Sequence, residues 1–270
     1  MIDILEIAAR KAGAVTLSYF HKESHISRKT SHQNLVTQAD FESQEAVKQS
    51  IIKSLAVQGI PSEDIGFIGE EHLDTKGKKH SFIIDPLDGT NNFASGLDYF
   101  SISIAHAVDG VLTDAVIYWP SRDILYYAHI GTGAFKKMKD QKPIRLMVSD
   151  ALLENSIIFT YLSSQKKYRA TIYPLLERLF EAVRGLRING SLCLDLAHLC
   201  DTENATHITI NFHGYLWDVA AGALIVKESG GIFADLLGNE IQVDCFDAQK
   251  QYSFIAAHPN VVEKLKHYLS

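Results

Sequence analysis

The stretch Ile83-Ile84-Asp85-Pro86-Leu87-Asp88-Gly89-Thr90-Asn91-Asn92-Phe93 joins an apolar run to two acids in a chain of 270 residues. A short apolar run of this kind predicts a buried strand, here one that ends in Asp85 and Asp88. Pro86 favours an extended backbone at Asp85. Two carboxylates and the Leu87 carbonyl within four residues are the ligand types that a hard cation such as Mg²⁺ prefers.

A tight turn is expected directly after these two acids. Gly89 permits such a turn, and Thr90 and Asn91 are expected to begin a short helix. The backbone N–H groups of Gly89 and Thr90 would then face outward and offer a seat for a phosphate group. Asp, Pro, Gly and Thr are also common in ordinary surface turns, so this stretch alone leaves that alternative open.

Three further acidic sites are expected at the ends of predicted elements. Glu70-Glu71 follow the apolar run 65–69, Asp218 opens a helix, and Asp40 follows Thr37 by three positions. A solvated strand end, a favourable helix dipole and a capping pair explain them one by one. A single metal cluster explains them together. Because Mg²⁺ ions held by carboxylates polarise a phosphoryl group and lower the pKa of bound water, the residues predict metal-assisted hydrolysis of a phosphate ester.

The composition excludes several other classes of protein. Hydrophobic residues make up 46% of the chain, and 32 acidic against 26 basic residues give a net charge of −6. These values are typical of a globular protein with a large core and not of a disordered chain. A net acidic chain without a basic run is poorly suited to general nucleic-acid binding. No apolar run approaches about 18 residues, the length that would predict a membrane span. Three cysteines outside any C-x-x-C pair favour reduced thiols, so we expect a cytoplasmic protein.

The order of predicted elements indicates a layered α/β or α+β architecture. Apolar spacing predicts helices near residues 4–19 and 39–56, with a polar loop at 24–31 between them. Strands then dominate, and Asp109-Gly110 is a strong hairpin signal. After residue 150 strands and helices alternate. We expect one domain over the whole chain, 1–270, with at most a subdomain boundary near 143–150.

In their order and spacing, the motifs of this chain resemble those of the inositol monophosphatase family, which are Mg²⁺-dependent, lithium-sensitive phosphatases. The resemblance runs from about residue 5 to 265. The matching motifs are Gly69-Glu70-Glu71, the stretch from Asp85 to Phe93, Trp217-Asp218-Val219-Ala220-Ala221-Gly222 and Gly230-Gly231, with weaker matches at 34–40 and 190–195.

This resemblance implies a fold, a ligand set and a mechanism. The implied fold is a layered αβαβα sandwich, and the implied assembly is a homodimer. The implied metal ligands are Glu70, Asp85, the Leu87 carbonyl, Asp88 and Asp218. The implied substrate contacts are Asp88, Gly89, Thr90, Gly190, Ser191, Asn211 and Asp218. Thr90 would help to activate the attacking water, with Asp40 orienting Thr90 and Glu70 supporting the water.

One departure from the family leaves the substrate open. Many inositol phosphatases have a Glu that holds the sugar hydroxyls seven residues before the Asp that matches Asp218, and here that position is Asn211. Asn can bond a hydroxyl but carries no charge. Inositol 1-phosphate is the expected substrate, and fructose 1,6-bisphosphate, a 3′(2′),5′-bisphosphate nucleotide and histidinol phosphate are alternatives. The Asn91-Asn92-Phe93 sequence favours the monophosphatase branch. A regulatory role in contact with RNA polymerase factors or RNA is an alternative of another class.

Other polar residues have ordinary structural interpretations. The twelve histidines form no H-x-H or H-E-x-x-H pattern, so no zinc site is expected. His213 is expected close to the proposed site. Asp195 lies among leucines on a predicted short helix and is expected to be a buried carboxylate with satisfied hydrogen bonds.

Overall fold

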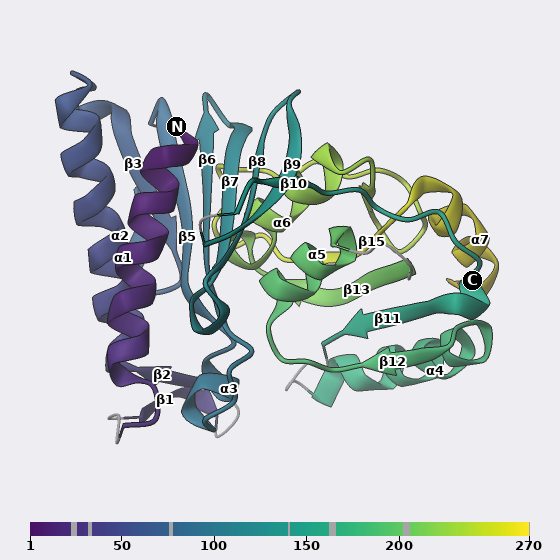
Figure 1. Ribbon diagram of the computed structural model, residues 1–270. Helices are drawn as coiled ribbons and strands as arrows, with labels where there is room; N and C mark the ends of the chain where they lie inside the picture. The colour runs from purple at the N-terminus through teal and green to yellow at the C-terminus, as the bar shows by residue number, and fades with distance from the viewer. Residues whose placement is uncertain are drawn as a thin grey trace.

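The chain folds into five layers, in the order helix, sheet, helix, sheet, helix. The computed structural model describes all residues except 23–25, 32–33, 76–77, 140, 162–165, 202–205 and 270. Figure 1 shows the layers from left to right, with α1 and α2 on one outer face and α4 and α7 on the other. The layered αβαβα sandwich expected from the resemblance is confirmed.

The first layer consists of two long helices, α1 (Ile2–Tyr19) and α2 (Gln38–Val57). Their apolar residues recur at helical spacing and therefore gather on one face. That face packs on the first sheet, where Leu5 and Ile51, among others, are fully buried against Phe82 and Ile104. The two helices predicted from apolar spacing are confirmed.

The second layer is an eight-stranded sheet in which β5 (His80–Asp88) lies between β3 (Ile65–Gly69) and β6 (Ser101–Val108). β5 runs parallel to β3, and the other neighbouring pairs are antiparallel. The remaining strands are β4 (Leu73–Asp74), β7 (Val111–Trp119), β8 (Ile124–His129), β9 (Gly133–Met138) and β10 (Ile144–Arg145). Asp109 and Gly110 both have positive φ between β6 and β7, which confirms the predicted hairpin.

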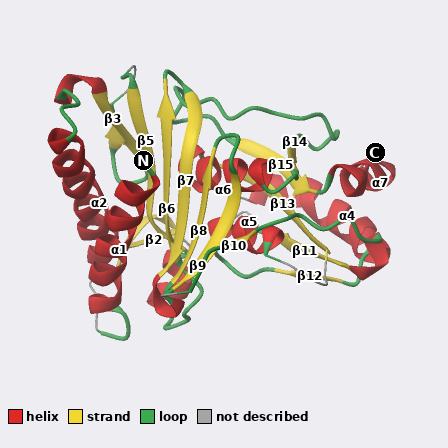
Figure 2. Cartoon of the chain, turned by 45° about the horizontal axis from the view of Figure 1, so that its top comes forward, coloured by secondary structure: helices red, strands yellow, loops and turns green. Residues whose placement is uncertain are grey.

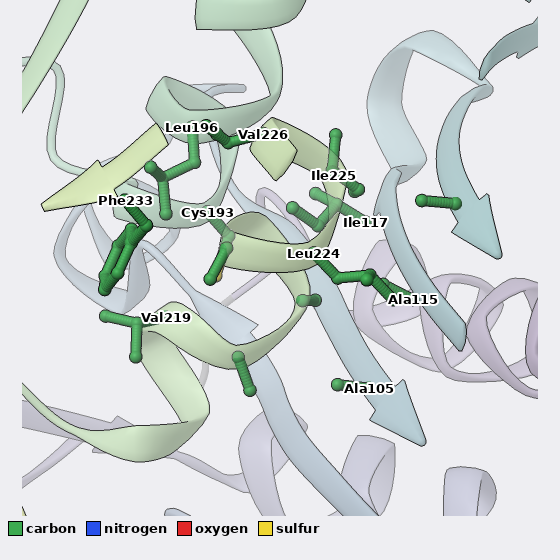
Figure 3. Close-up of a cluster of buried hydrophobic side chains, with 14 of the residues drawn as sticks. Ala105, Ala115, Ile117, Cys193, Leu196, Val219, Leu224, Ile225, Val226 and Phe233 are labelled. Carbon is green, nitrogen blue, oxygen red and sulfur yellow. The ribbon is translucent and has the colours of Figure 1, made fainter. Parts of the chain in front are cut away.

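The middle layer consists of α5 (Leu192–Cys200) and α6 (Leu216–Glu228), which fill the space between the two sheets. Every residue of α6 from Val219 to Val226 is buried, as expected for a helix covered on all sides. Figure 3 shows Leu196 of α5 and Ile117 of the sheet in this core. Gly222 allows the two helices to approach closely, because a Cβ there would lie 2.3 Å from the Leu196 side chain.

The fourth and fifth layers come from the last part of the chain. The second sheet has the order β12 (Gly185–Arg187), β11 (Ser156–Thr160), β13 (Thr206–Gly214), β15 (Tyr252–Ala257) and β14 (Ile232–Ala234). Its outer face is covered by α4 (Lys166–Ala182) and α7 (Pro259–Leu269), as Figure 2 shows. The first sheet thus ends at Arg145, and the second begins at Ser156.

One local expectation was wrong. Residues 26–31 of the expected loop form β1 (Ile26–Ser31), which pairs antiparallel with β2 (Asn34–Thr37), because backbone pairing does not require apolar side chains. The strand expected to deliver the two acids is present and runs through Asp88, and the short helix expected from Thr90 is α3 (Thr90–Ala94). Short 3₁₀ turns occupy Ser62–Asp64, Pro120–Arg122 and Leu153–Asn155. Among the described residues, no helix has both the length and the apolar character needed to cross a membrane.

Candidate metal and phosphate site

Two carboxylates occupy the end of β5, inside the molecule. Asp85 is only 2% exposed and Asp88 only 8%. Asp85 pairs with Ser103 and Asp88 with Ser101, so the regular register of β5 and β6 is interrupted between the two acids. The Leu87 N–H donates to Asp85 Oδ1 at 3.1 Å, while the Leu87 side chain is fully buried. This irregularity places two acids and a backbone carbonyl at one strand end.

Gly89 makes the turn after β5 possible. Its φ is +93°, a value that side chains with a Cβ rarely adopt. A Cβ there would also lie 3.0 Å from the Tyr99 carbonyl oxygen and 3.3 Å from the Gly190 carbonyl oxygen. The turn therefore requires glycine both for its dihedral angle and for the close approach of two other backbone segments.

Thr90 is the first residue after this turn, and its hydroxyl lies between two oxygen acceptors. Thr90 Oγ1 is 3.1 Å from Asp40 Oδ1 and 3.0 Å from the Leu87 carbonyl oxygen. Asp40 is fully buried in the first turn of α2, where its Oδ2 accepts hydrogen bonds from the Thr37 N–H at 2.7 Å and the Thr37 hydroxyl at 2.6 Å. The expected capping pair is therefore present, and the same carboxylate reaches the turn after β5.

Two glutamates follow β3, the parallel neighbour of β5. Because Gly69 pairs with Ile84, Glu70 follows its strand at the level where Asp85 follows Ile84. Glu71 is buried, and its backbone is held by the Gln44 side chain, which donates to the Glu71 carbonyl at 2.9 Å and accepts from the Glu71 N–H at 3.3 Å. The strand register thus brings Glu70 to the acids of β5, while Glu71 serves to join β3 to α2.

Asp218 enters the site from α6. It lies in the first turn of the helix, where its Oδ2 accepts a hydrogen bond from the Tyr215 N–H at 2.6 Å. Burial raises the pKa of the Asp85 carboxyl well above its ordinary value, and the neighbouring charges of Glu70, Asp88 and Asp218 raise it further. The charges of Glu70, Asp88 and Asp218 therefore act on the buried carboxyl of Asp85.

The start of α5 holds Asp88. The carboxylate accepts hydrogen bonds from the Leu192 N–H at 3.1 Å, the Cys193 N–H at 3.0 Å and the Ser191 hydroxyl. The Ser101 hydroxyl donates to it at 3.2 Å. Burial raises the pKa of Asp88 in spite of these donors. The partial positive charge at the N-terminus of α5 accounts for the position of the buried Asp88 carboxylate. It does not neutralise the whole cluster of acids.

The donor set fits a divalent cation. Within the described part of the chain, one group brings potential ligand atoms to within 4.8 Å of one another, and it contains Asp85, Asp88 and Cys193. Burial, and after it the like charges of the neighbouring acids, raises the pKa of Asp85, and a cation between the carboxylates would offset both effects. Carboxylate and carbonyl oxygens are ligands for Mg²⁺. Asp85, Asp88, the Leu87 carbonyl, Glu70 and Asp218 are the groups available to hold it.

The expected substrate contacts of the second half lie beside this cluster. Gly190 has a φ of +85° and Ser191 is the N-cap of α5, bonded to Asp88. Asn211 is 2% exposed on β13, and its Oδ1 has no hydrogen-bond partner among the described residues. A Cβ on Gly214 would lie 2.7 Å from Asn211 Nδ2 and 3.4 Å from the Leu192 side chain, so Asn211 is close to the start of α5.

Several residues near the acids escaped the sequence reasoning. The Cys193 thiol lies 3.4 Å from the Asp218 carbonyl oxygen. Tyr161 follows β11, and burial together with the charges of Asp218 and Asp88 raises the pKa of its phenol. Cys193 stands two positions after Ser191, in the first turn of the predicted short helix, and this proximity was a usable signal. Tyr161 offered no signal, because only the parallel register of β11 and β13, in which Thr160 pairs with Ile210, brings the end of β11 to this part of β13.

Known proteins match this chain over nearly its whole length. The sequence model of the inositol monophosphatase family matches residues 1–269. A fructose-1,6-bisphosphatase/inositol-1-monophosphatase of Thermotoga maritima is 32% identical over 254 residues, which cover 94% of this chain and 91% of that protein. The Nus factor SuhB of Haemophilus influenzae is 32% identical over 272 residues, covering 98% and 94%. The crystal structure of the extragenic suppressor protein SuhB of Bartonella henselae superposes with a TM-score of 0.84 at 30% identity, covering 100% of this chain and 98% of that one. The chain therefore belongs to the inositol monophosphatase family.

Proposed function

We propose that the protein is a Mg²⁺-dependent phosphomonoesterase that hydrolyses a small phosphorylated polyol, with inositol 1-phosphate as the expected substrate. The observation that carries the proposal is the convergence of Asp85, Asp88 and Asp218 beside the turn at Gly89. Glu70 follows the neighbouring strand at the level of Asp85. Membership in a phosphatase family supports it, as does the name of the Thermotoga maritima relative. The fit of the donor set to a hard cation supports the choice of metal.

In this proposal Asp85, Asp88, Asp218, Glu70 and the Leu87 carbonyl hold the metal. Bound Mg²⁺ supplies the positive charge that stabilises the phosphoryl oxygens and acidifies the attacking water. Phosphoryl transfer depends mainly on such positioning and charge stabilisation. The residues of the chain itself therefore act chiefly by fixing atoms in place.

The turn at Gly89 and the Thr90 hydroxyl are assigned to the phosphate and the water. The backbone N–H groups of Gly89 and Thr90 would donate to the phosphate oxygens. Thr90 Oγ1 lies within hydrogen-bond distance of Asp40 Oδ1, so Asp40 can hold the hydroxyl in one orientation. Glu70 would support the water that attacks phosphorus directly, without a phosphoenzyme. Asn211 and the 190–191 segment would contact the polyol.

The proposal is tested by phosphate release from inositol 1-phosphate with and without Mg²⁺. We expect activity to require the metal and to fall by a factor on the order of 10³ or more in Asp88→Asn, because a ligand charge is lost. Asp109→Asn is the matched control, since Asp109 is exposed in the β6–β7 hairpin. Full activity in Asp88→Asn, or after complete removal of divalent ions, would contradict the assignment.

The identity of the substrate is a separate question. A panel of inositol 1-phosphate, fructose 1,6-bisphosphate, a 3′(2′),5′-bisphosphate nucleotide and histidinol phosphate, ranked by kcat/KM, decides it. We expect inositol 1-phosphate to rank first. The neutral Asn211 is the reason for including substrates with a second charged group.

A regulatory role is the second candidate, because two relatives whose alignments cover 98% of this chain are named Nus factor SuhB. Binding to transcription factors or RNA would not need hydrolysis. We therefore expect any such binding to survive in Asp88→Asn, measured by pull-down with wild-type protein as reference. Loss of binding in Asp88→Asn would show that regulatory binding depends on the same site as hydrolysis.

We further propose a cytoplasmic homodimer that lithium inhibits, as the family resemblance implies. Sedimentation at micromolar concentration tests the oligomeric state. Inhibition of phosphate release by LiCl, with KCl at equal ionic strength as control, tests the lithium response. A monomer, or equal rates in the two salts, would remove the corresponding part of the proposal.

A further inference from the structure

Four residues from two distant parts of the chain form a closed hydrogen-bonded ring next to the acidic site. Asn92 Nδ2 donates to the carbonyl oxygens of Tyr99 and Asn189, at 2.7 Å each. Asn189 Nδ2 donates to Asp195 Oδ1 at 2.7 Å, and the Tyr99 hydroxyl donates to the same oxygen at 2.8 Å. The ring, defined as Asn92, Tyr99, Asn189 and Asp195, joins α3 to α5 across the two halves of the chain.

Asp195 is firmly placed within this ring. It is 2% exposed, and its carbonyl oxygen accepts a hydrogen bond from the Thr209 hydroxyl of β13 at 3.3 Å. The Tyr99 hydroxyl also lies 2.9 Å from His198 Nδ1. Burial lowers the pKa of His198 to about 4, so at neutral pH a neutral imidazole can donate from Nδ1 to the Tyr99 oxygen. The phenol proton is then directed at Asp195.

The ring controls a short segment that touches the proposed site. Asn189 is followed by Gly190, where a Cβ would lie 3.0 Å from the Asn92 amide, and by Ser191, which donates to Asp88. The Gly190 carbonyl oxygen in turn lies 3.3 Å from the position of a Cβ on Gly89. Residues 189–191 are therefore the point at which the start of α5 meets the turn after β5.

We propose that Asp195 is a positioning residue, which through this ring sets residues 189–191 against the turn at Gly89 and so determines how the polyol end of the substrate is held. The inference rests on the proposed function, because residues 190–191 are its polyol contacts. Asp195 itself does not touch the substrate. It acts through Asn189 and Tyr99, because its carboxyl oxygen accepts hydrogen bonds from the Asn189 amide and from the Tyr99 hydroxyl. The phosphate end, held by Gly89 and Thr90, depends on it much less.

The test compares Asp195→Ala, which removes the acceptor, with Asp195→Asn, whose Oδ1 can accept both bonds. Asp201→Asn, at the other end of α5, is the matched control, since Asp201 bonds Lys136 and Tyr126 and not the ring. With Mg²⁺ saturating, kcat and KM are measured for inositol 1-phosphate, and the inhibition constant is measured for inorganic phosphate. We expect Asp195→Ala to raise KM roughly tenfold or more, as the loss of two bonds to a carboxylate implies.

The other parameters separate positioning from general damage. We expect kcat and the phosphate inhibition constant of Asp195→Ala to stay within about threefold of wild type, and KM of Asp195→Asn to return close to wild type. Asn92→Ala should raise KM as well, and the double variant should not add the two effects, because both break one ring. Tyr99→Phe, which removes one hydroxyl, gives the same test if Asp195→Ala does not fold.

Two outcomes would overturn the inference. One is an unchanged KM in Asp195→Ala or, where that variant does not fold, in Tyr99→Phe. The other is an equal loss of kcat and of phosphate affinity, which would indicate a merely structural role. An inactive wild-type protein would instead contradict the proposed function, so the two failures are distinguishable.

Discussion

The carboxylate of Asp88 accepts a hydrogen bond from the backbone N–H of Cys193, 3.0 Å away and 105 positions later in the chain. The last residue of β5 is therefore fixed by the first turn of α5. Since a helix N-terminus carries partial positive charge, α5 stabilises a negative charge that burial would otherwise suppress.

Ser191→Ala removes the hydroxyl that donates to Asp88 and leaves the N–H groups of Leu192 and Cys193 in place. A hydrogen bond to a charged group contributes about 2 kcal/mol, so we expect the dissociation constant for Mg²⁺, measured by calorimetry, to rise roughly tenfold or more. Ser229→Ala is the control, because the Ser229 hydroxyl bonds the Ile225 carbonyl far from the acids. Equal metal affinity in the two variants would show that Ser191 does not hold Asp88.

Gly89→Ala should abolish activity while the fold survives. The left-handed conformation costs about 1–2 kcal/mol in alanine, and the Cβ would press on the Tyr99 and Gly190 carbonyl oxygens. Gly131→Ala is a matched control, since Gly131 has φ +75° and a Cβ there would meet no described atom within 4 Å. Thermal unfolding and phosphate release are measured for both. Similar activity in the two variants would contradict the role of the turn.

Asp195 should make the folded state less stable as pH rises. Burial raises the pKa of Asp195 to about 7 from an ordinary 3.8, against the hydrogen bonds of Asn189 and Tyr99. The folded state keeps this proton up to a higher pH than the unfolded state does, so Asp195 adds to the free energy of unfolding at low pH. This stabilisation is fully present below pH 3.8 and is lost as the pH rises to about 7. Its size is about 4 kcal/mol. Urea unfolding of wild type and Asp195→Asn from pH 4 to 8 measures it. Parallel curves for the two proteins would be the contrary result.

Asp114 should act in the opposite sense. Burial opposes its ionisation, but hydrogen bonds from His106, His129 and Thr113 outweigh burial and lower its pKa to about 2. Its contribution of about 2 kcal/mol is present above pH 3.8 and is lost as pH falls towards 2. Asp114→Asn should therefore be less stable than wild type at pH 7, and the difference should vanish near pH 2. A difference that persists there, in acid unfolding, would exclude this cause.

Asn211→Ala should weaken the binding of polyol esters selectively. The Asn211 Oδ1 is buried and has no hydrogen-bond partner among the described residues, so a substrate hydroxyl that donates to it would relieve the cost of an unsatisfied acceptor. We expect KM for inositol 1-phosphate to rise about tenfold and KM for p-nitrophenyl phosphate, which has no hydroxyl there, to change little. Equal changes for both esters would place Asn211 outside the substrate contacts.

Local pattern predicted much of this structure. The apolar run before Asp85 predicted the strand that delivers the acids, because buried strands read as continuous apolar runs. The spacing of Thr37 and Asp40 predicted the capping pair, which the structure contains. These features depend on residues within one or two turns of each other.

Features that depend on register could not be predicted from the residues alone. His80, His106, Asp114 and His129 form a row of hydrogen bonds across β5, β6, β7 and β8. No short motif marks them, since a shift of one residue in any strand would reverse the direction of its side chain. The ring through Asp195 could not be predicted from the residues alone either, because its four members come close only when α3 meets α5.

The order in which the acids occur along the chain has a consequence for biosynthesis. Asp85 and Asp88 are translated early, whereas α5 and Asp218 of α6 come more than one hundred residues later. A nascent chain that has not reached α5 carries the first acids without the helix end that holds Asp88 and without the middle layer that covers the first sheet. The acidic site and the core between the two sheets are therefore completed by the same late segments. A truncated product that lacks these segments has neither a complete site nor a complete core.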